Sequence, residues 1–98
     1  MNGYFVARVK GPSMMPTWHD GDLLLARRLQ QGETITQGDV CIARFPDVEG
    51  LVIKRAMTVL PKRGVFLLSD SHLCTDDSRR FGFATPIARI VTRLWRSR

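Results

Sequence analysis

The chain has 98 residues, enough for one domain with a modest hydrophobic core, and its 44% hydrophobic and 24% charged residues argue against intrinsic disorder. Fifteen Lys and Arg residues against nine Asp and Glu residues give a net charge of +6, which favours anionic partners such as nucleic acid, an acidic protein or an anionic membrane face. The arginines are spread along the chain rather than gathered in one tract, so a solubilising basic surface is the simpler interpretation.

The predicted elements are short strands separated by turns that contain Gly or Pro. Such a series of short strands at regular intervals is typical of a mainly β fold, and we expect a single domain over residues 1–98. The last apolar segment, residues 87–95, has interspersed arginines and fits either a strand or a helix. In chain order the expected elements are strands at residues 4–9, 23–26, 40–45, 51–60 and 65–68, a loop at 30–38, hairpin turns at 46–50 and 61–64, and an irregular polar segment at 69–80.

The first candidate for chemistry is Ser13, in the run Gly-Pro-Ser-Met-Met-Pro-Thr at residues 11–17. The Gly-Pro break before this serine and the proline after it hold the backbone in a bend. A bend of this kind presents a hydroxyl together with neighbouring N–H groups, as an acyl-transfer site requires. The alternative is an ordinary loop with a capping serine.

The second candidate is Lys54, within the expected strand at residues 51–60. Because strand side chains alternate between faces, Lys54 should share a face with Val52, Ala56 and Thr58. A lysine on an apolar face loses hydration, so its pKa falls and it can act as a neutral base. The alternative is a lysine whose stem is buried and whose ammonium group reaches water.

The third candidate is the polar segment at residues 69–82, which contains hydroxyls, three carboxylates and two arginines. By itself it fits a solvated loop, a helix cap or a weak cation site. Its aspartates lack the spacing of a calcium-binding loop. The residues His19, His72 and Cys74 show no spacing that supports a closed metal site, so no metal is expected.

Together these segments resemble the type I signal peptidase family of Ser–Lys serine peptidases. The resemblance rests on Ser-Met-x-Pro-Thr at residues 13–17 and Asp-Ser-Arg-x-x-Gly at residues 77–82, with Val-Ile-Lys-Arg at 52–55 between them and Gly-Asp steps at 21–22 and 38–39. It covers most of the chain, from about residue 11 to residue 95. The fold that it implies is a mixed or coiled antiparallel sheet, like the catalytic core of signal peptidase and of repressor-type Ser–Lys peptidases.

The resemblance implies a role for each matching residue. In the Ser13-Met14 step, Ser13 would be the nucleophile, and Lys54 would be its general base. Thr75 stands where the family usually has a serine that orients the lysine, and Asp77 and Arg79 would support the site. The matching segment often opens with Gly-Asp-Asn in the family, where this chain has Ser-Asp-Ser at residues 69–71.

One position departs from the family in a way that bears on the oxyanion hole. Bacterial members often have a serine two residues before the nucleophile, whose hydroxyl joins the hole, but here that position is Gly11. The hole must then use the Ser13 N–H and another donor.

Typical family members carry a membrane anchor, and we expect none here. The chain is most similar to a small soluble branch associated with maturation of nickel-containing superoxide dismutase. The implied substrate is a protein with an N-terminal leader, such as the precursor of that enzyme, and the implied chemistry needs no cofactor.

Three alternatives stay open. One is a self-cleaving, repressor-type Ser–Lys domain, although Pro16-Thr17 and the Asp-Ser-Arg element argue against it. Another is a small basic β-barrel that binds nucleic acid, but the aromatic residues show no stacking-platform spacing with the arginines, so no specific nucleic-acid binding is expected. The third is a protein with the fold and no activity.

Two further features bear on the cell compartment. Cys41 and Cys74 form no CxxC pair, and we expect both to be free and non-catalytic in a reducing environment. No apolar run approaches the roughly 20 residues that span a bilayer. The N-terminal residues are charged too soon for a signal peptide. The expectation is therefore a soluble, cytoplasmic protein without a transmembrane segment.

Overall fold

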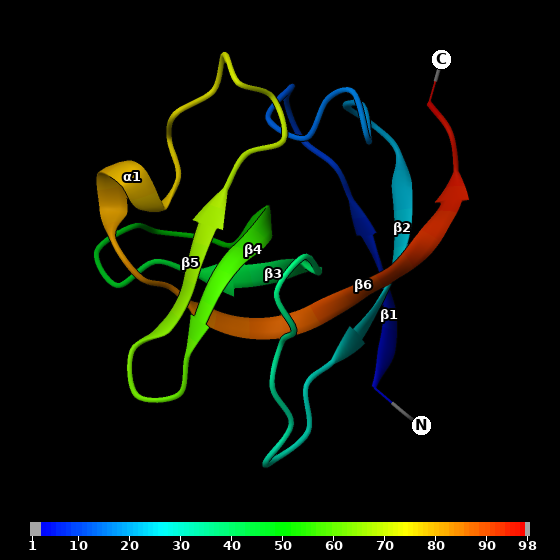
Figure 1. The fold of residues 1–98 in the computed structure, drawn as a ribbon. Helices are drawn as coiled ribbons and strands as arrows, with labels where there is room; N and C mark the ends of the chain where they lie inside the picture. Colours follow the sequence, from blue (N-terminus) through cyan, green and yellow to red (C-terminus); the bar gives the residue numbers. More distant parts are fainter. Residues whose placement is uncertain (1–2, 98) are drawn as a thin grey trace.

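The computed structural model describes residues 3–97, and it confirms the prediction of a mainly β fold. Within these residues lie six strands and one helical turn (Figure 1). In chain order they are β1 (Tyr4–Arg8), β2 (Leu23–Arg28), β3 (Val40–Arg44), β4 (Val52–Leu60), β5 (Gly64–Leu68), α1 (Ser78–Phe81) and β6 (Thr85–Trp95). The open question about residues 87–95 is settled, since they belong to a strand. No helix in this part of the chain is long and apolar enough to cross a membrane.

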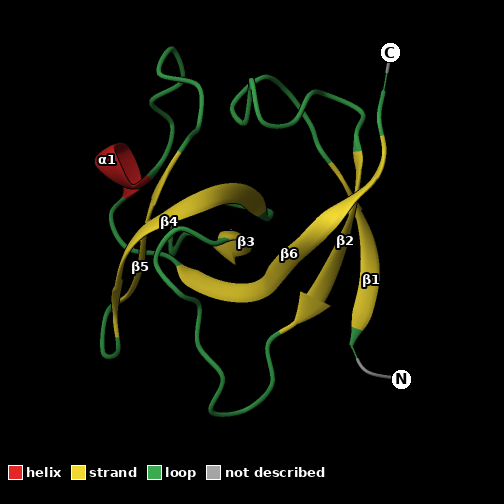
Figure 2. Ribbon diagram, turned by 45° about the vertical axis from the view of Figure 1, so that its right-hand side comes forward, coloured by secondary structure: helices red, strands yellow, loops and turns green. Residues whose placement is uncertain are grey.

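The strands form one antiparallel sheet in the order β1-β2-β6-β3-β4-β5. Both predicted hairpins are confirmed, because β3 pairs with β4 and β4 pairs with β5. The long strand β6 pairs with β2 and with β3, and its pairing is interrupted by register shifts on both sides. Such irregularities bend a strand, and Figure 2 shows β6 curving across the molecule between its two halves.

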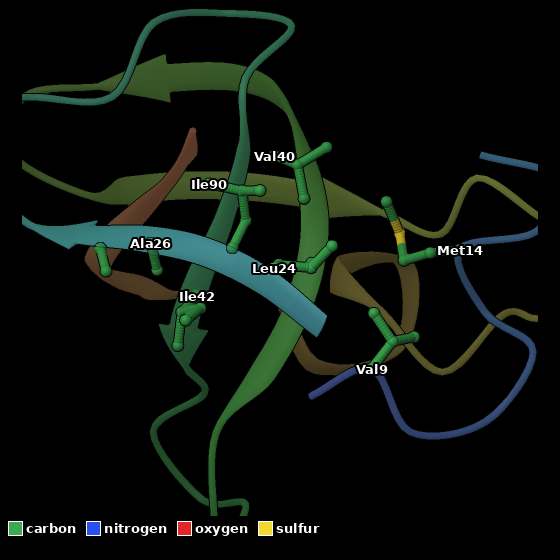
Figure 3. Close-up of a cluster of buried hydrophobic side chains, with 8 residues drawn as sticks. Val9, Met14, Leu24, Ala26, Val40, Ile42 and Ile90 are labelled. Atoms are coloured by element: carbon green, nitrogen blue, oxygen red, sulfur yellow. The ribbon is translucent and has the colours of Figure 1, made fainter. Parts of the chain in front are cut away.

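The buried side chains gather in two hydrophobic clusters, one on each side of β3. Val40 and Ile42 point into the first cluster and Cys41 and Ala43 into the second, as strand alternation requires. Burial on both faces explains why β3 is apolar from Val40 to Ala43. Figure 3 shows the first cluster, whose buried members are Val9, Met14, Leu24, Ala26, Val40, Ile42, Ala88 and Ile90. The second comprises Ile35, Cys41, Ala43, Phe45, Ala56, Val65, Leu67 and Ala84.

The predicted alternation along β4 holds only as far as Ala56. The register against β5 shifts between Ala56 and Thr58, which leaves Met57 as an extra residue. Beyond this bulge the faces are exchanged, so Val59 packs against the second cluster while Thr58 is exposed. The prediction that Thr58 shares the face of Lys54 is therefore wrong.

The segment predicted to be irregular, residues 69–80, contains the start of α1. Asp77 caps this helical turn, because its side chain accepts a hydrogen bond from the backbone N–H of Arg79. The turn is short, yet it fixes the position of Asp77, which is fully buried.

Candidate active site

Two loops far apart in the sequence lie at the same end of the sheet (Figures 1 and 2). One, residues 9–22, joins β1 to β2, and the other, residues 69–77, joins β5 to α1. Two hydrogen bonds connect them: the Ser71 N–H donates to the Ser13 carbonyl at 2.9 Å, and Thr17 Oγ1 donates to Asp70 Oδ2 at 2.6 Å. The polar segment and the Ser13 loop therefore form one structural unit.

Ser13 lies in a tightly turned part of the first loop. The Met15 N–H donates to the Pro12 carbonyl at 3.1 Å, and the next peptide bond, Met15–Pro16, is cis. Met14 is only 1% exposed and enters the first cluster, as Figure 3 shows. The residue after the serine is thus an anchor in the core, while Ser13 itself is half-buried at the surface.

The backbone N–H groups around Ser13 differ in their partners. The Gly11 N–H donates to Asp20 Oδ1 at 2.7 Å, at a residue whose φ of +80° favours glycine. Within residues 3–97 the Ser13 N–H has no acceptor. It is therefore available to donate to a ligand.

Lys54 is buried on the inner face of β4, with 6% of its surface exposed. Its Nζ donates to Ser69 Oγ at 3.0 Å. Burial lowers the pKa of Lys54 because it disfavours the ammonium form, whereas the nearby Asp77, Cys74 and Asp76 act in the opposite direction. The net result is a lysine more easily neutralised than one in water.

Ser13 and Lys54 line the same two clefts. The apolar cleft, of about 480 Å³, is bordered by Phe5 and Ala7 of β1, by Val9 just after that strand, and by Val52 and Ile53 at the start of β4. The polar cleft, of about 460 Å³, is bordered by Lys10, Pro12, Leu73, Cys74, Thr75 and Asp76. The structure thus brings the two residues together at the boundary between a hydrophobic and a hydrophilic recess.

Asp77 and Arg79 form a hydrogen-bond network that reaches Lys54 through Ser69. Arg79 donates to both carboxylate oxygens of Asp77, from Nε at 3.0 Å and from NH2 at 2.7 Å. The Ser69 N–H donates to Asp77 Oδ2 at 2.9 Å. Burial of Asp77 raises its pKa, but the hydrogen bonds from Arg79 and Ser69 outweigh this and lower it to about 2. Asp77 therefore stays ionised and paired at neutral pH.

The other residues singled out by the sequence lie around the clefts. Thr75 is exposed and borders the polar cleft. At Gly11 an added Cβ would meet nothing within 4 Å. Both cysteines are free, and burial raises the pKa of the Cys41 thiol to about 12. Within residues 3–97 no three His, Cys, Asp or Glu side chains are close enough to hold a metal ion.

Sequence reasoning missed the contacts made by Ser69 and Asp70. Lys54 and Arg55 are neighbours on β4, and their side chains reach Ser69 and Asp70 respectively. A regular hairpin from the predicted turn would place Lys54 opposite Asp70, whereas the observed register pairs Arg55 with Leu68 and so places Lys54 beside Ser69. The bulge at Met57, which sets that register, was not readable from the sequence.

Comparison with known proteins gives one family match. The Peptidase S24-like family model matches residues 1–81, a span that contains Ser13, Lys54 and the whole of the 69–77 loop. No match was found among curated proteins.

Proposed function

The chain belongs to the Peptidase S24-like family, and we propose that it is a Ser–Lys serine endopeptidase that removes an N-terminal leader from a protein substrate. The substrate that we propose is the precursor of a nickel-containing superoxide dismutase. The first part rests on the family and on the site, and the second on the resemblance to the signal-peptidase-like maturation proteases.

One observation carries the proposal: a buried lysine with a lowered pKa and a half-buried serine line the same pair of clefts. A lysine in water has a pKa of about 10.4 and is almost fully charged at neutral pH. Burial of Lys54 increases the fraction of neutral amine, which is the form that can accept a proton.

In the proposed reaction, neutral Lys54 takes the proton from the Ser13 hydroxyl as the serine oxygen attacks the scissile carbonyl. The Ser13 N–H stabilises the resulting oxyanion, a contribution of roughly 3–4 kcal/mol per donor in other serine hydrolases. The new amino terminus leaves with the proton from Lys54. Water then attacks the acyl-enzyme and gives a proton to Lys54. The bond between the acyl carbon and the Ser13 oxygen breaks, and Lys54 returns the proton to that oxygen.

The substrate chain would bind in extended form along β1. This strand is at the edge of the sheet, and its side chains Phe5 and Ala7 line the apolar cleft together with Val9, the next residue. An edge strand offers unpaired backbone groups to an added strand, and the cleft below offers room for alternate apolar side chains. The leader should therefore carry apolar residues near the cleavage site.

The proposal is tested by co-expression with a leader-bearing nickel superoxide dismutase precursor, followed by mass analysis of the N-terminus. We expect wild type to remove the leader at one bond. Ser13→Ala and Lys54→Met should fold and lose at least about a thousandfold in rate. Lys62→Met, which removes an exposed lysine, is the matched control and should remain active. Near wild-type cleavage by either dyad variant would refute the dyad.

A second arm separates the enzyme class from its substrate. The purified chain is incubated alone and with a proteome-derived peptide library, and all products are identified by mass. Cleavage of library peptides but not of the precursor would leave the peptidase in place and overturn the substrate. Cleavage of the chain itself alone would favour the self-cleaving alternative.

A further inference from the structure

We propose that Ser69 is the positioning residue for the base: its hydroxyl fixes the Lys54 amine at the cleft boundary shared with Ser13, the task that the resemblance gives to Thr75. This inference rests on the proposed function and names a further residue of the same site. Ser69 stands where the resembled family often has glycine, so the family pattern does not supply this hydroxyl.

The contact is short and shielded from water. Lys54 Nζ and Ser69 Oγ are 3.0 Å apart, and the two residues are 6% and 9% exposed. The backbone of Ser69 is itself held, since its N–H donates to Asp77 Oδ2 at 2.9 Å and Asp77 is clamped by Arg79. The hydroxyl is therefore presented from a rigid support.

The bulge in β4 creates this contact. Near the turn the pairs are Leu60 with Gly64 and Thr58 with Phe66, a register that would place Lys54 opposite Asp70 if it continued. The extra residue, Met57, shifts the register by one, so that Arg55 pairs with Leu68 and Lys54 comes beside Ser69. Bulges often re-aim side chains next to active sites.

Thr75 is in a different situation. It is exposed, and its side chain makes no hydrogen bond within residues 3–97. Its backbone carbonyl accepts from the Asp77 N–H at 2.9 Å. Its contribution would be to the shape of the polar cleft, which it borders.

The hydrogen bond to Ser69 suits the chemistry of a neutral base. An amine that donates one N–H to Ser69 Oγ keeps its lone pair for the proton of Ser13. After the transfer, the ammonium group still donates to Ser69 and has two N–H groups left for the serine and the leaving group. Without this partner the amine would rotate among several orientations, and those that direct its lone pair toward the Ser13 hydroxyl would be rarer.

The test compares Ser69→Ala with Thr75→Val, each lacking one hydroxyl. Two readouts are measured: kcat and KM against pH, and the titration of Lys54 followed by NMR with 13C-labelled lysine. The chain has only Lys10, Lys54 and Lys62, so Lys54→Met assigns the signal. The NMR titration needs no substrate, and it therefore tests the positioning role even if the proposed substrate fails.

For Ser69→Ala we expect kcat to fall about 10- to 100-fold with little change in KM, because the amine is misaimed but the substrate still binds. The Lys54 titration should move to lower pH, since the ammonium form loses an acceptor. Thr75→Val should change kcat less than about threefold and leave the titration in place. Ser69→Thr, which keeps a hydroxyl, should recover most of the activity.

Three results would overturn the proposal. One is an unmoved titration in Ser69→Ala, and another is a larger loss of kcat in Thr75→Val than in Ser69→Ala. The third is a titration that moves to higher pH, since that would mean that the substitution merely admits water to Lys54. Should Ser69→Ala fail to fold, Ser69→Gly, which carries the residue common in the resembled family, is measured in its place.

Discussion

Arg55 and Asp70 form a two-point ion pair, with Nε donating to Oδ1 and NH2 donating to Oδ2, both at 2.7 Å. The same carboxylate accepts the hydroxyl of Thr17 at 2.6 Å. Asp70 thus fastens the Ser13 loop to β4 at the residue next to Lys54. Planar two-point pairing fixes orientation as well as distance, which a lysine at the Arg55 position would not do.

Asp70→Asn should therefore lower kcat/KM without changing the pKa of Lys54. The amide keeps the size of the side chain but loses the charge, so the loop that carries Ser13 loosens. We expect kcat/KM to fall about 10- to 100-fold, while the Lys54 titration observed by NMR stays in place. Asp47→Asn, at an exposed turn, is the control and should be neutral. A shifted Lys54 titration in Asp70→Asn would show that Asp70 acts on the base instead.

Arg79→Ala should raise the pKa of Lys54. The Asp77 carboxylate favours the ammonium form of Lys54, and Arg79 now offsets part of that charge. Activity needs the neutral amine, so it rises with pH through the pKa of Lys54, and this acidic limb should move to higher pH in the variant.

The matched control for Arg79→Ala is Arg80→Ala. Arg80 pairs with Asp76, but both side chains are largely exposed, so water screens the change and the limb should move less. A lower plateau with an unmoved limb in Arg79→Ala would show that Arg79 acts only by holding the loop.

Asp77 is buried, whereas the adjacent Asp76 is exposed. Replacing each with alanine should therefore change the free energy of unfolding by different amounts. Asp77→Ala leaves the Ser69 N–H without its acceptor in a buried place, which should lower the free energy of unfolding by about 1–3 kcal/mol. Asp76→Ala, at an exposed site, should change it by less than about 0.5 kcal/mol. Urea denaturation measures both values.

The stabilisation by Asp77 should also depend on pH. Its pKa is lowered to about 2 in the folded protein, against about 3.9 for an unfolded chain. The stabilisation is therefore complete above about pH 4 and is lost as the pH falls through about 2. The difference between wild type and Asp77→Ala should narrow over that range. A difference that stays constant down to pH 2 would contradict the assignment.

The two cysteines should respond differently to alkylation. Cys41 is fully buried with a raised pKa and should not react in the folded protein. Cys74 is half-buried and borders the polar cleft, so a bulky maleimide there should block cleavage while Cys74→Ser remains active. Loss of activity in Cys74→Ser would indicate a catalytic thiol, contrary to the prediction from the sequence.

Nucleic-acid binding should be weak and electrostatic. Arg27, Arg55, Arg79 and Arg89 are engaged with carboxylates of the same chain, so these four guanidinium groups are less available for contacts with phosphates. Affinity for random DNA, measured by fluorescence anisotropy, should fall steeply between about 50 and 200 mM salt. Tight, sequence-selective binding at physiological salt would contradict this prediction.

The strands were predictable because they are short apolar runs between turn residues, and both hairpins follow from adjacency in the chain. The sheet order was not predictable. The insertion of β6 between β2 and β3 depends on contacts between distant residues such as Ala26 with Ile90 and Cys41 with Arg89. The helical turn α1 was open only as the helix-cap alternative for residues 69–82, because four residues give no periodic signal.

At the site, burial of Lys54 was predicted from the apolar alternation of its strand, and the structure agrees. The partner of its amine was not predicted, since it depends on the bulge at Met57, which no local pattern in the sequence marks. Likewise, nothing local to Arg55 and Asp70 indicated that they would meet.

The placement of Ser13 and Lys54 on different hydrophobic clusters has a consequence for adaptation to temperature. Met14 anchors the serine loop in the first cluster, whereas the β4 face that carries Lys54 continues with Ala56 in the second. The separation of the serine from the lysine therefore depends on the packing of the two clusters on the two faces of β3, as well as on the ion pair between Arg55 and Asp70. Substitutions that change the packing between the two clusters are a route by which an organism adapted to cold or heat could change the temperature at which turnover is fastest. Such substitutions would leave Ser13 and Lys54 unchanged.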